Sequence, residues 1–229
     1  MCGRFTLSTP PTEIAHHFGL AEEPKLEARF NVAPGQAIAT VSDSGGGRRP
    51  VLSLRRWGLV PSWSKDTKIG NRLINARAET AAEKPSFLSA LRRRRCLVPA
   101  DGFYEWAGEK GSKQPYCIGL EGRALFAFAG LWERWTDPQG EPLESCTLLT
   151  TAAAEQLRAL HHRMPVIVDP ADYALWMDPG VEEPDLVSSV IDRNLGGALE
   201  FYPISKYVND VRHDDPRCLE ASAKQPGFF

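Results

Sequence analysis

The stretch CLVPADGFYEW (residues 96–106) decides the fold class, because it packs branched and aromatic residues around an Asp-Gly turn. Such runs favour β-strands. Three similar runs follow it closely, at YCIGL (116–120), ALFAFAGLW (124–132) and CTLLTTAA (146–153). Further strands are predicted at AIATV (37–41) and VLSLRRWGL (51–59), and later at MPVIVD (164–169) and LEFYPIS (199–205). The centre of the chain is therefore expected to be a β core.

Helices are predicted between and around these strands. One should begin near Pro10, capped by Ser8 or Thr9, and stop at Gly19. Others are expected in KPSFLSALRRRRC (84–96), near 153–160, in PADYALWM (170–177) and near 184–194. Because helices and strands do not alternate regularly, the pattern predicts an α+β fold rather than α/β. SDSGGGRRP (42–50) is expected to be a flexible loop. No segment has the character of a linker, so we expect one domain over 1–229.

Composition excludes several classes of protein. The chain has 229 residues, a net charge of −2 and 42% hydrophobic residues. The absence of an apolar run of about 18 residues argues against a membrane span, and no apolar signal segment opens the chain. The five cysteines are odd in number and widely spaced, without a C-x-x-C pair. This pattern argues against a disulfide framework and against a zinc site, and it favours a cytoplasmic location.

A nucleic-acid site on this near-neutral chain would have to be a local basic patch. Candidates are the arginine pairs at 48–49 and 55–56 and the run of four at 92–95. Each of these is equally consistent with a solvated face of a helix or loop.

Three further stretches carry residues suited to chemistry. NRLINARAET (71–80) places Asn75 and Arg77 two apart, so both point to one side if the chain is extended. PADGFYEW (99–106) places Glu105 between two aromatic residues, a setting suited to proton transfer near neutral pH. LHHRMPVIV (160–168) places His161 just before a buried strand. Each residue also has a structural explanation: a turn, an ion pair and a structural histidine.

Taken together, the motifs resemble a known family. MCGRF (1–5), FNVAPGQ (30–36), WGLVPSW (57–63) and the three stretches above occur in one order, and YPISKYVND (202–210) follows them. This series resembles the SRAP family (SOS response-associated peptidase, also called abasic site processing proteins). The resemblance covers residues 1 to about 210, and leaves 211–229 as a C-terminal tail. It implies a largely antiparallel, barrel-like β core with a few peripheral helices.

The resemblance also implies site residues. The catalytic set would be Cys2, Asn75, Glu105 and His161, where asparagine holds the sugar or amine and the last two move protons. DNA contacts would come from Arg4 and Arg77 on phosphates, Trp63 and Trp106 in stacking or pocket positions, Asn31 and Pro34 on a wedge loop, and Thr151 in the site. Thr150 is the rival to Thr151. No metal or cofactor is implied.

The implied activity is covalent capture of abasic sites in single-stranded DNA. After removal of Met1, the Cys2 amine would form a Schiff base with the opened sugar, and its thiol would close a thiazolidine ring. An α-amine has a pKa of about 7.7–8.0, against about 10.4 for lysine, so part of it is unprotonated at neutral pH. Gly3 lets the backbone approach the sugar closely.

Associated lyase chemistry through the Schiff base is expected. Two alternatives stay open, a thiol (auto)peptidase with Cys2 as nucleophile and a non-catalytic module that binds single-stranded DNA. We expect a cytoplasmic monomer that joins the nucleoid when bound to DNA and has no membrane partner.

Overall fold

A closed β-barrel forms the centre of the molecule. The structure, a computed structural model, describes residues 2–43, 49–109 and 111–222. The barrel consists of β3 (Ala37–Ser42), β4 (Val51–Trp57), β6 (Arg95–Ala100), β9 (Phe126–Thr136) and β10 (Pro142–Ala152). Its strand order is β10-β4-β3-β6-β9, and β9 pairs again with β10 to close the ring. The β4–β10 pair is parallel and the other pairs are antiparallel. The predicted α+β fold with a largely antiparallel barrel is confirmed.

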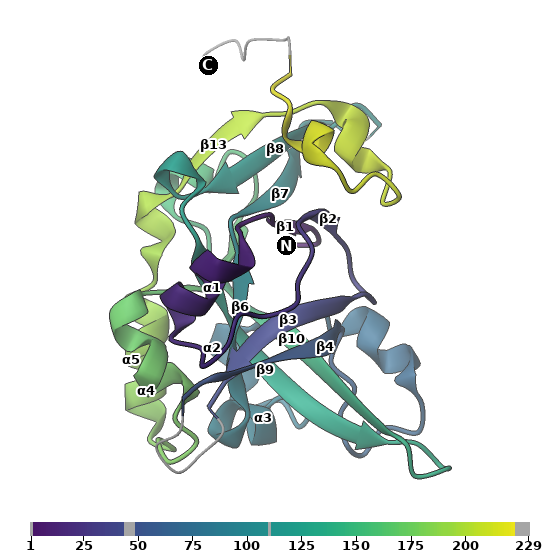
Figure 1. Cartoon of the computed structure of the whole chain (residues 1–229), viewed down its shortest axis with the longest axis vertical. Helices are drawn as coiled ribbons and strands as arrows, with labels where there is room; N and C mark the ends of the chain where they lie inside the picture. The colour runs from purple at the N-terminus through teal and green to yellow at the C-terminus, as the bar shows by residue number, and fades with distance from the viewer. Residues whose placement is uncertain (1, 44–48, 110, 223–229) are drawn as a thin grey trace.

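A second, antiparallel sheet lies over one end of the barrel (Figure 1). Its order is β13 (Glu200–Pro203), β8 (Gln114–Gly119), β7 (Gly102–Ala107), β1 (Phe5–Leu7) and β2 (Arg29–Val32). Three short strands extend the barrel: β5 (Asn75–Arg77) and β11 (Arg163–Pro165) pair with β10, and β12 (Ile167–Val168) pairs with β9. The N-terminal strand β1 is therefore held between β2 and β7, directly above the barrel.

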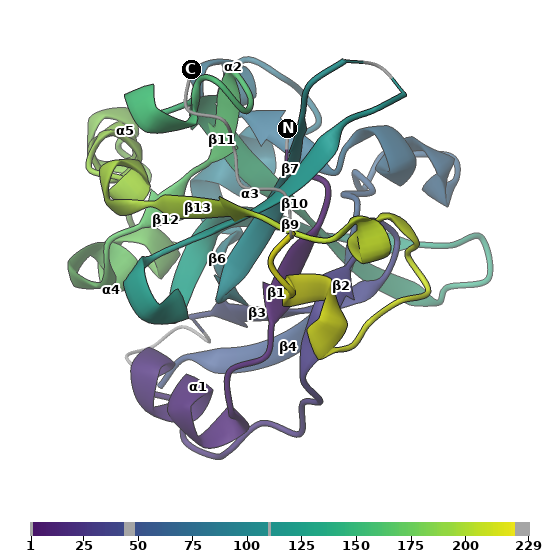
Figure 2. The ribbon, with the colours of Figure 1, turned by 90° about the horizontal axis from the view of Figure 1, so that it is seen from above.

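Short helices surround this core. The α-helices are α1 (Pro11–Phe18), α2 (Ala78–Ala81), α3 (Leu88–Arg93), α4 (Tyr173–Met177) and α5 (Pro184–Asp192). Short 3-10 helices are η1 (Thr67–Arg72), η2 (Glu121–Arg123), η3 (Glu155–Leu157), η4 (Pro170–Asp172), η5 (Leu195–Ala198), η6 (Lys206–Asn209) and η7 (Pro216–Leu219). Figure 2 shows α1, α4 and α5 along one side of the barrel. The helix expected near 153–160 is only the turn η3. The loop expected at 42–50 lies in part, at 44–48, outside the described residues.

The alternation of the barrel strands separates two apolar cores. One core joins outward-facing residues of the strands, such as Val41 and Leu97, to buried residues of α1, α4 and α5. The other fills the barrel and includes Trp57 and Phe128. Phe5 of β1 closes the upper end, with its ring centroid 5.3 Å from Trp57 and 5.8 Å from Phe128. The same core includes Cys2, so the start of the chain is anchored in the barrel interior.

The predicted caps of the first helix are wrong. Helix α1 begins at Pro11 with Pro10 in the cap position, and no side chain caps it. Ser8 and Thr9 instead donate their hydroxyls and main-chain N–H groups to Asp101. Pro at the first turn needs no cap for its missing N–H. The predicted stop is confirmed, since Gly19 takes the left-handed conformation at φ 64°.

The arginine run 92–95 is neither a continuous basic patch nor a fully solvated face. Helix α3 ends at Arg93, and Arg94 pairs with Glu133 at 2.6 Å. Arg95 opens β6 and is 2% exposed. Its guanidinium donates to five main-chain carbonyls, those of Leu91, Arg92, Trp176, Asp178 and Val181. Helix ends leave such carbonyls without partners within the helix. The buried guanidinium of Arg95 therefore supplies hydrogen-bond donors to the carbonyl ends of α3 and α4.

Candidate active site

The position of Cys2 follows from the pairing of β1 with β7. Phe5 lies opposite Phe103 and Thr6 opposite Gly102, and the Tyr104 N–H donates to the Arg4 carbonyl at 3.0 Å. This bond extends the antiparallel pairing by one residue, to Arg4 and Tyr104. Two rows of main-chain hydrogen bonds therefore hold the residues that follow Cys2.

The Cys2 thiol is buried. It donates to the Arg4 carbonyl at 3.7 Å. Burial raises the thiol pKa well above its ordinary value, and the negative charge of Glu105 raises it further. A buried thiol near a carboxylate is a weak thiolate donor at neutral pH. Burial and the charge of Glu105 therefore both favour the thiol over the thiolate.

Asn75 reaches Cys2 from the barrel wall. Strand β5 runs parallel to β10, with Asn75 opposite Leu148, and its extended form confirms the expected geometry. The Asn75 Nδ2 donates to the Cys2 carbonyl at 2.7 Å. Its Oδ1 is buried and has no hydrogen-bond partner within the described part of the chain. A buried acceptor without a partner is costly, so this oxygen is available for a donor that arrives with a substrate.

Glu105 lies on β7 and is only 6% exposed. Its charge raises the pKa of both Cys2 and His161, so the carboxylate lies near both groups. The expectation of an aromatic setting on both sides is wrong. Neighbouring residues of a strand point to opposite faces, so Glu105 shares a face with Phe103 and not with Tyr104 and Trp106. The latter two belong to a different apolar cluster from Phe103.

His161 stands on the loop between η3 and β11. The Arg163 N–H donates to its Nδ1 at 2.9 Å, and the carbonyl of the same residue lies 3.1 Å away. An N–H can only donate, so Nδ1 accepts and the neutral ring carries its proton on Nε2. Burial lowers the pKa of His161, while the Glu105 charge opposes this. The neighbouring His162 ring is exposed and stacks on His161 at 4.4 Å.

The four predicted catalytic residues therefore belong to one cluster, although they come from four segments. Cys2 contacts Asn75 directly, and Glu105 acts electrostatically on Cys2 and His161. An amide, a carboxylate, an imidazole and a thiol in one place can bind a carbonyl group and move protons around it.

Arg4 lies on the opposite face of β1 from the barrel. Its Nη1 donates to Asn31 Oδ1 at 2.7 Å and to the Val208 carbonyl at 3.0 Å. Its Cζ lies 5.8 Å from the ring centroid of Trp106, whose Nε1 donates to Asn209 Oδ1 at 2.7 Å. These hydrogen-bond partners are uncharged, and the charge of Asp210 acts on the guanidinium as well.

The structure separates the two residues expected on the wedge loop. Asn31 is fully buried, and its Nδ2 donates to the carbonyls of Val208, Asp210 and His213. Together with the bond from Arg4, these contacts leave no polar atom of the Asn31 side chain facing outward. Pro34 is exposed. The wedge assignment therefore fits Pro34, whereas Asn31 fixes Arg4 against the C-terminal segment.

Trp63, Arg77 and Thr151 keep accessible side chains. Trp63 is 59% exposed, Arg77 is exposed and Thr151 is half-buried. Thr150 is fully buried, and its hydroxyl donates to the Ala76 carbonyl at 3.3 Å. The burial of Thr150 favours Thr151 as the residue that lines the site.

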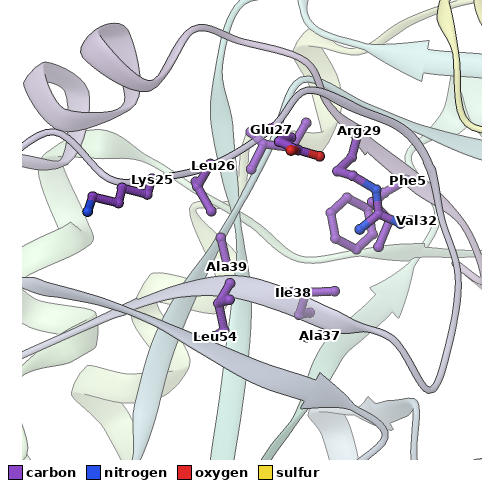
Figure 3. A pocket seen from close by; sticks show the side chains of 11 residues that line it. Phe5, Lys25, Leu26, Glu27, Arg29, Val32, Ala37, Ile38, Ala39 and Leu54 are labelled. Carbon is purple, nitrogen blue, oxygen red and sulfur yellow. The ribbon is translucent and has the colours of Figure 1, made fainter.

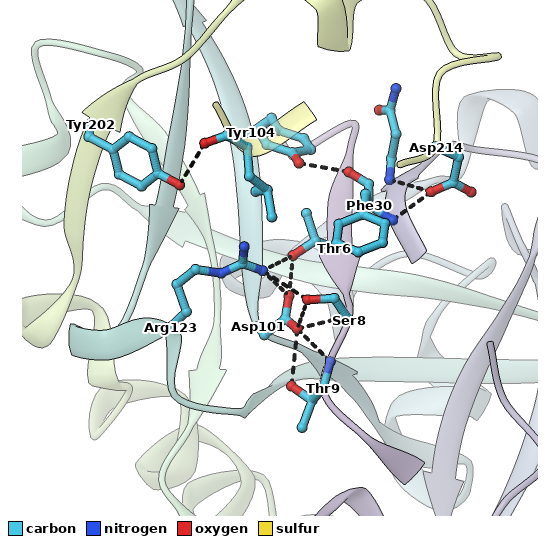
Figure 4. Close-up of polar contacts among 11 residues, drawn as sticks. Thr6, Ser8, Thr9, Phe30, Asp101, Tyr104, Arg123, Tyr202 and Asp214 are labelled. Carbon is cyan, nitrogen blue, oxygen red and sulfur yellow. Dashed lines mark hydrogen bonds and ion pairs between the residues drawn. The ribbon is translucent and has the colours of Figure 1, made fainter. Parts of the chain in front are cut away.

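Asp101 is a residue whose role the sequence did not reveal. Its side chain is 3% exposed, and it accepts hydrogen bonds from Thr6, Ser8 and Thr9 and an ion pair from Arg123 at 2.8 Å (Figure 4). These contacts join the turn before β7 to the end of β1. The Asp-Gly pair pointed to a turn, but it gave no sign that the aspartate would clamp the N-terminal strand.

Arg163 is a second such residue. It makes a two-pronged ion pair with Glu79, at 2.6 and 2.8 Å, and donates to the Thr150 carbonyl at 2.5 Å. These bonds fix the residue whose main-chain N–H holds His161. The sequence signal was the adjacency of His161 and Arg163, although the partner Glu79 lies 84 positions away.

A cavity of about 260 Å³ opens beside β1 but is separate from this cluster. It is bounded by the 25–29 segment and by β3 and β4, with Leu26, Ile38 and Leu54 among its walls (Figure 3). Phe5 forms part of its wall, and none of the four catalytic candidates does. Over the described residues, no group of three or more His, Cys, Asp or Glu side chains is placed to hold a metal ion. Within the same ranges, no helix has the length and apolarity needed to cross a membrane.

Comparison with known proteins identifies the family. A model of the SOS response associated peptidase (SRAP) family matches residues 1–211. Abasic site processing protein YoqW of Bacillus subtilis is 41% identical over 225 residues, which cover 96% of this chain and 100% of that protein. Abasic site processing protein HMCES of Gallus gallus is 38% identical over 194 residues, which cover 74% of this chain and 57% of that protein. A crystal structure of a Bacteroides thetaiotaomicron protein superposes with a TM-score of 0.83 at 25% identity, covering 96% of this chain and 100% of that one. The chain belongs to the SRAP family.

Proposed function

We propose that this protein processes abasic sites in single-stranded DNA by capturing them covalently through Cys2. The observation that carries the proposal is the 2.7 Å contact between Asn75 Nδ2 and the Cys2 carbonyl, in a cluster that also holds Glu105 and His161. The relatives named abasic site processing proteins support the same choice of substrate.

The proposed chemistry needs Cys2 as the first residue. The free α-amine adds to the aldehyde carbon of the ring-opened sugar, and loss of one water gives an imine. The thiol then adds across the C=N bond, with sulfur bonding to carbon and the proton ending on nitrogen. Amine, aldehyde and thiol thus become a thiazolidine and one water. Ring closure is intramolecular, so it gains a large effective concentration.

The site residues have separate tasks in this scheme. The free Oδ1 of Asn75 accepts from the amine or a sugar hydroxyl. Glu105 accepts the thiol proton, which the raised pKa of Cys2 otherwise retains. His161, kept neutral by its lowered pKa, takes and returns protons as the carbinolamine loses water. Lyase activity follows from the same imine, since it permits β-elimination before the ring closes.

The burial of Cys2 weighs against the thiol peptidase alternative. A peptidase nucleophile needs a thiolate beside a basic histidine. Here burial and the charge of Glu105 both disfavour the thiolate. The hydrogen bond found for the Cys2 sulfur goes to a carbonyl, that of Arg4. A single domain acting as a cytoplasmic monomer is part of the proposal.

The test is denaturing electrophoresis of the protein with an oligonucleotide that carries one abasic site, after intact mass has established that Met1 is absent. We expect a heat-resistant shifted band. Cys2→Ser keeps the amine but lacks the sulfur, so it should cleave some abasic strand and give no heat-stable adduct. A variant with one residue inserted between Met1 and Cys2 should also give none while mass spectrometry shows that the insertion is retained. A normal level of adduct from that variant would refute the proposal.

A further inference from the structure

A groove separate from the catalytic cluster lies between α3 and the segment that follows α4. The cavity has a volume of about 480 Å³, and its walls include Arg92, Arg93, Arg94 and Glu182. Figure 1 shows α3 near the lower end of the barrel and β1 above its upper end. None of the four catalytic candidates lines the groove, so the proposed capture of DNA does not use this surface.

Helix α3 supplies one wall of the groove through a single face. Leu88 and Arg92 are four positions apart, so they are neighbours on the surface of the helix. A turn before the helix extends this face to Pro85, because the Leu88 N–H donates to the Lys84 carbonyl at 2.9 Å. The opposite face packs into the core through the buried Ala90. The groove thus has an apolar end at Pro85 and Leu88 and a cationic end that begins at Arg92.

The cations of the groove are only partly neutralised. Arg92 is exposed, and no ion pair within the described part of the chain includes it. Arg93 contacts Glu182 at 3.1 Å, with side chains 68% and 45% exposed. Exposed pairs of this kind contribute little stability, so another carboxylate can replace Glu182. Arg94 pairs with Glu133, but its buried Nε has no hydrogen-bond partner among the described residues. The groove therefore favours an added negative charge.

The buried Arg95 joins the two walls of the groove. Its Nη1 donates to the carbonyls of Leu91 and Arg92, at 2.7 and 2.8 Å, at the end of α3. Its Nη2 donates to the carbonyls of Asp178 and Val181 in the opposite wall. The walls are therefore fixed before anything binds between them, and a preformed site loses little entropy on binding.

The groove suits an acidic peptide better than a nucleic-acid backbone. Guanidinium groups bind both carboxylates and phosphates. A nucleic-acid strand carries a phosphate at every nucleotide, so it would bring charge against Glu182 and leave the apolar end unused. A peptide can place carboxylates at the arginines and an apolar side chain against Pro85 and Leu88. Arginine beside apolar contact area is typical of protein interfaces.

We propose that this groove binds an acidic segment of a partner protein. Carboxylates of the segment pair with Arg92 and Arg93, and an apolar side chain next to them packs on Pro85 and Leu88. The partner occupies a surface away from Cys2, so it can stay bound while the protein holds DNA.

The test is fluorescence anisotropy of the full chain with a labelled peptide of about ten residues, made of aspartate and glutamate with one central phenylalanine. Wild-type protein should bind this peptide. A peptide with serine in place of phenylalanine should bind more weakly, and so should one with amides in place of the acids. The double variant Arg92→Gln, Arg93→Gln should raise Kd by roughly twofold to thirtyfold, because two exposed ion pairs with the peptide are lost.

A matched variant separates groove contacts from net charge. Lys25→Gln with Lys113→Gln removes the same charge from exposed positions outside the groove, and should leave Kd unchanged. Arg92 and Arg93 are exposed, so the double variant should keep a urea midpoint close to that of wild type and form a normal level of abasic-site adduct.

The inference fails if wild type does not bind the acidic peptide, or if the Arg92, Arg93 variant binds it as well as the Lys25, Lys113 control does. Equal affinity for the phenylalanine and serine peptides would also overturn it. A labelled oligothymidine that competes with the peptide and loses affinity in the double variant would show a nucleic-acid site instead. Peptide binding needs no chemistry at Cys2, so failure of covalent capture would show separately, as absence of adduct.

Discussion

The Asp101→Asn variant should be less stable than wild type, because it loses the contacts that join the end of β1 to the start of β7. The carboxylate is 3% exposed and accepts from Thr6, Ser8, Thr9 and Arg123. An amide of the same shape turns one acceptor into a donor that faces other donors. Removing one partner of a buried ion pair costs about 3–5 kcal/mol. Arg123 is 30% exposed, so we expect about 3 kcal/mol, and a Tm lower by about 6–12 °C for a chain of this length.

The effect should depend on pH in a defined direction. Burial by itself raises the pKa of Asp101, but the hydrogen bonds from Thr6 and Ser8 and the charge of Arg123 outweigh it and hold the pKa below the ordinary 3.8. A carboxylate with a lowered pKa contributes stability above its unfolded-state pKa, and that contribution is lost as the pH falls through its folded-state pKa. The difference in free energy of unfolding between wild type and Asp101→Asn should therefore be complete at pH 7. It should shrink as the pH falls below about 3.8.

The assay is urea unfolding followed by tryptophan fluorescence, at pH 7 and in steps down to pH 3. Glu182→Gln is the control, since it removes the carboxylate of an exposed ion pair with Arg93, with side chains 45% and 68% exposed. Such pairs contribute about 0–1 kcal/mol. Asp101→Asn could lose no more free energy of unfolding than Glu182→Gln, or its loss could be independent of pH. Either result would show that the Asp101 carboxylate does not hold β1 to the start of β7.

Three further outcomes are expected. Asn31→Ala should lower the free energy of unfolding by about 1–3 kcal/mol, because buried carbonyls lose their hydrogen-bond donor. It should also weaken DNA binding, because Arg4 loses its contact with Asn31. Unchanged urea unfolding would contradict this prediction. Glu105→Gln removes the charge that raises the pKa values of His161 and Cys2, so NMR titration of the imidazole and the pH dependence of thiol alkylation should both move to lower pH. Gly70→Ala should lower the free energy of unfolding by about 1–3 kcal/mol, because its Cβ would lie 2.6 Å from the Gly58 carbonyl oxygen. A variant as stable as wild type would mean that β4 and η1 are not held together by this close approach.

Local patterns predicted the strands of the barrel well, because runs of branched and aromatic residues favour the β conformation whatever their distant partners. The stop at Gly19 also followed from a local rule, whereas the extended form of Asn75–Arg77 was only a condition of the argument about their side chains. What the sequence could not supply was the choice of partner for polar groups. Ser8 and Thr9 have the chemistry of helix caps, but a carboxylate 92 or 93 positions away takes their hydrogen bonds.

Two errors about charge and burial have the same origin. Arg95 looks like the end of a solvated basic run, yet carbonyls from α3 and α4 surround it. Asn31 looks like an exposed turn residue, yet the segment around Val208 and His213 covers it. The burial of Asn31, and the bonds of Arg95 to Trp176, Asp178 and Val181, depend on segments more than 80 positions away, where no local period carries information. The proposed catalytic set was reached only through the order of its motifs, since each member alone had an ordinary structural explanation.

The arrangement around β1 explains how a chain terminus can serve as a reactive group. Terminal residues usually fray, because few contacts offset their entropy. Here β1 has only three residues, but it pairs on both sides, plugs the barrel with Phe5 and is clamped by Asp101. These contacts hold the chain in place from Leu7 back to Arg4. Asn75 then holds the Cys2 carbonyl, two residues closer to the N-terminus. Folding therefore places Cys2 beside Asn75, and within electrostatic reach of Glu105, before any DNA binds, so binding does not have to order these groups. Loosening any one of these contacts should therefore slow capture before it lowers DNA affinity.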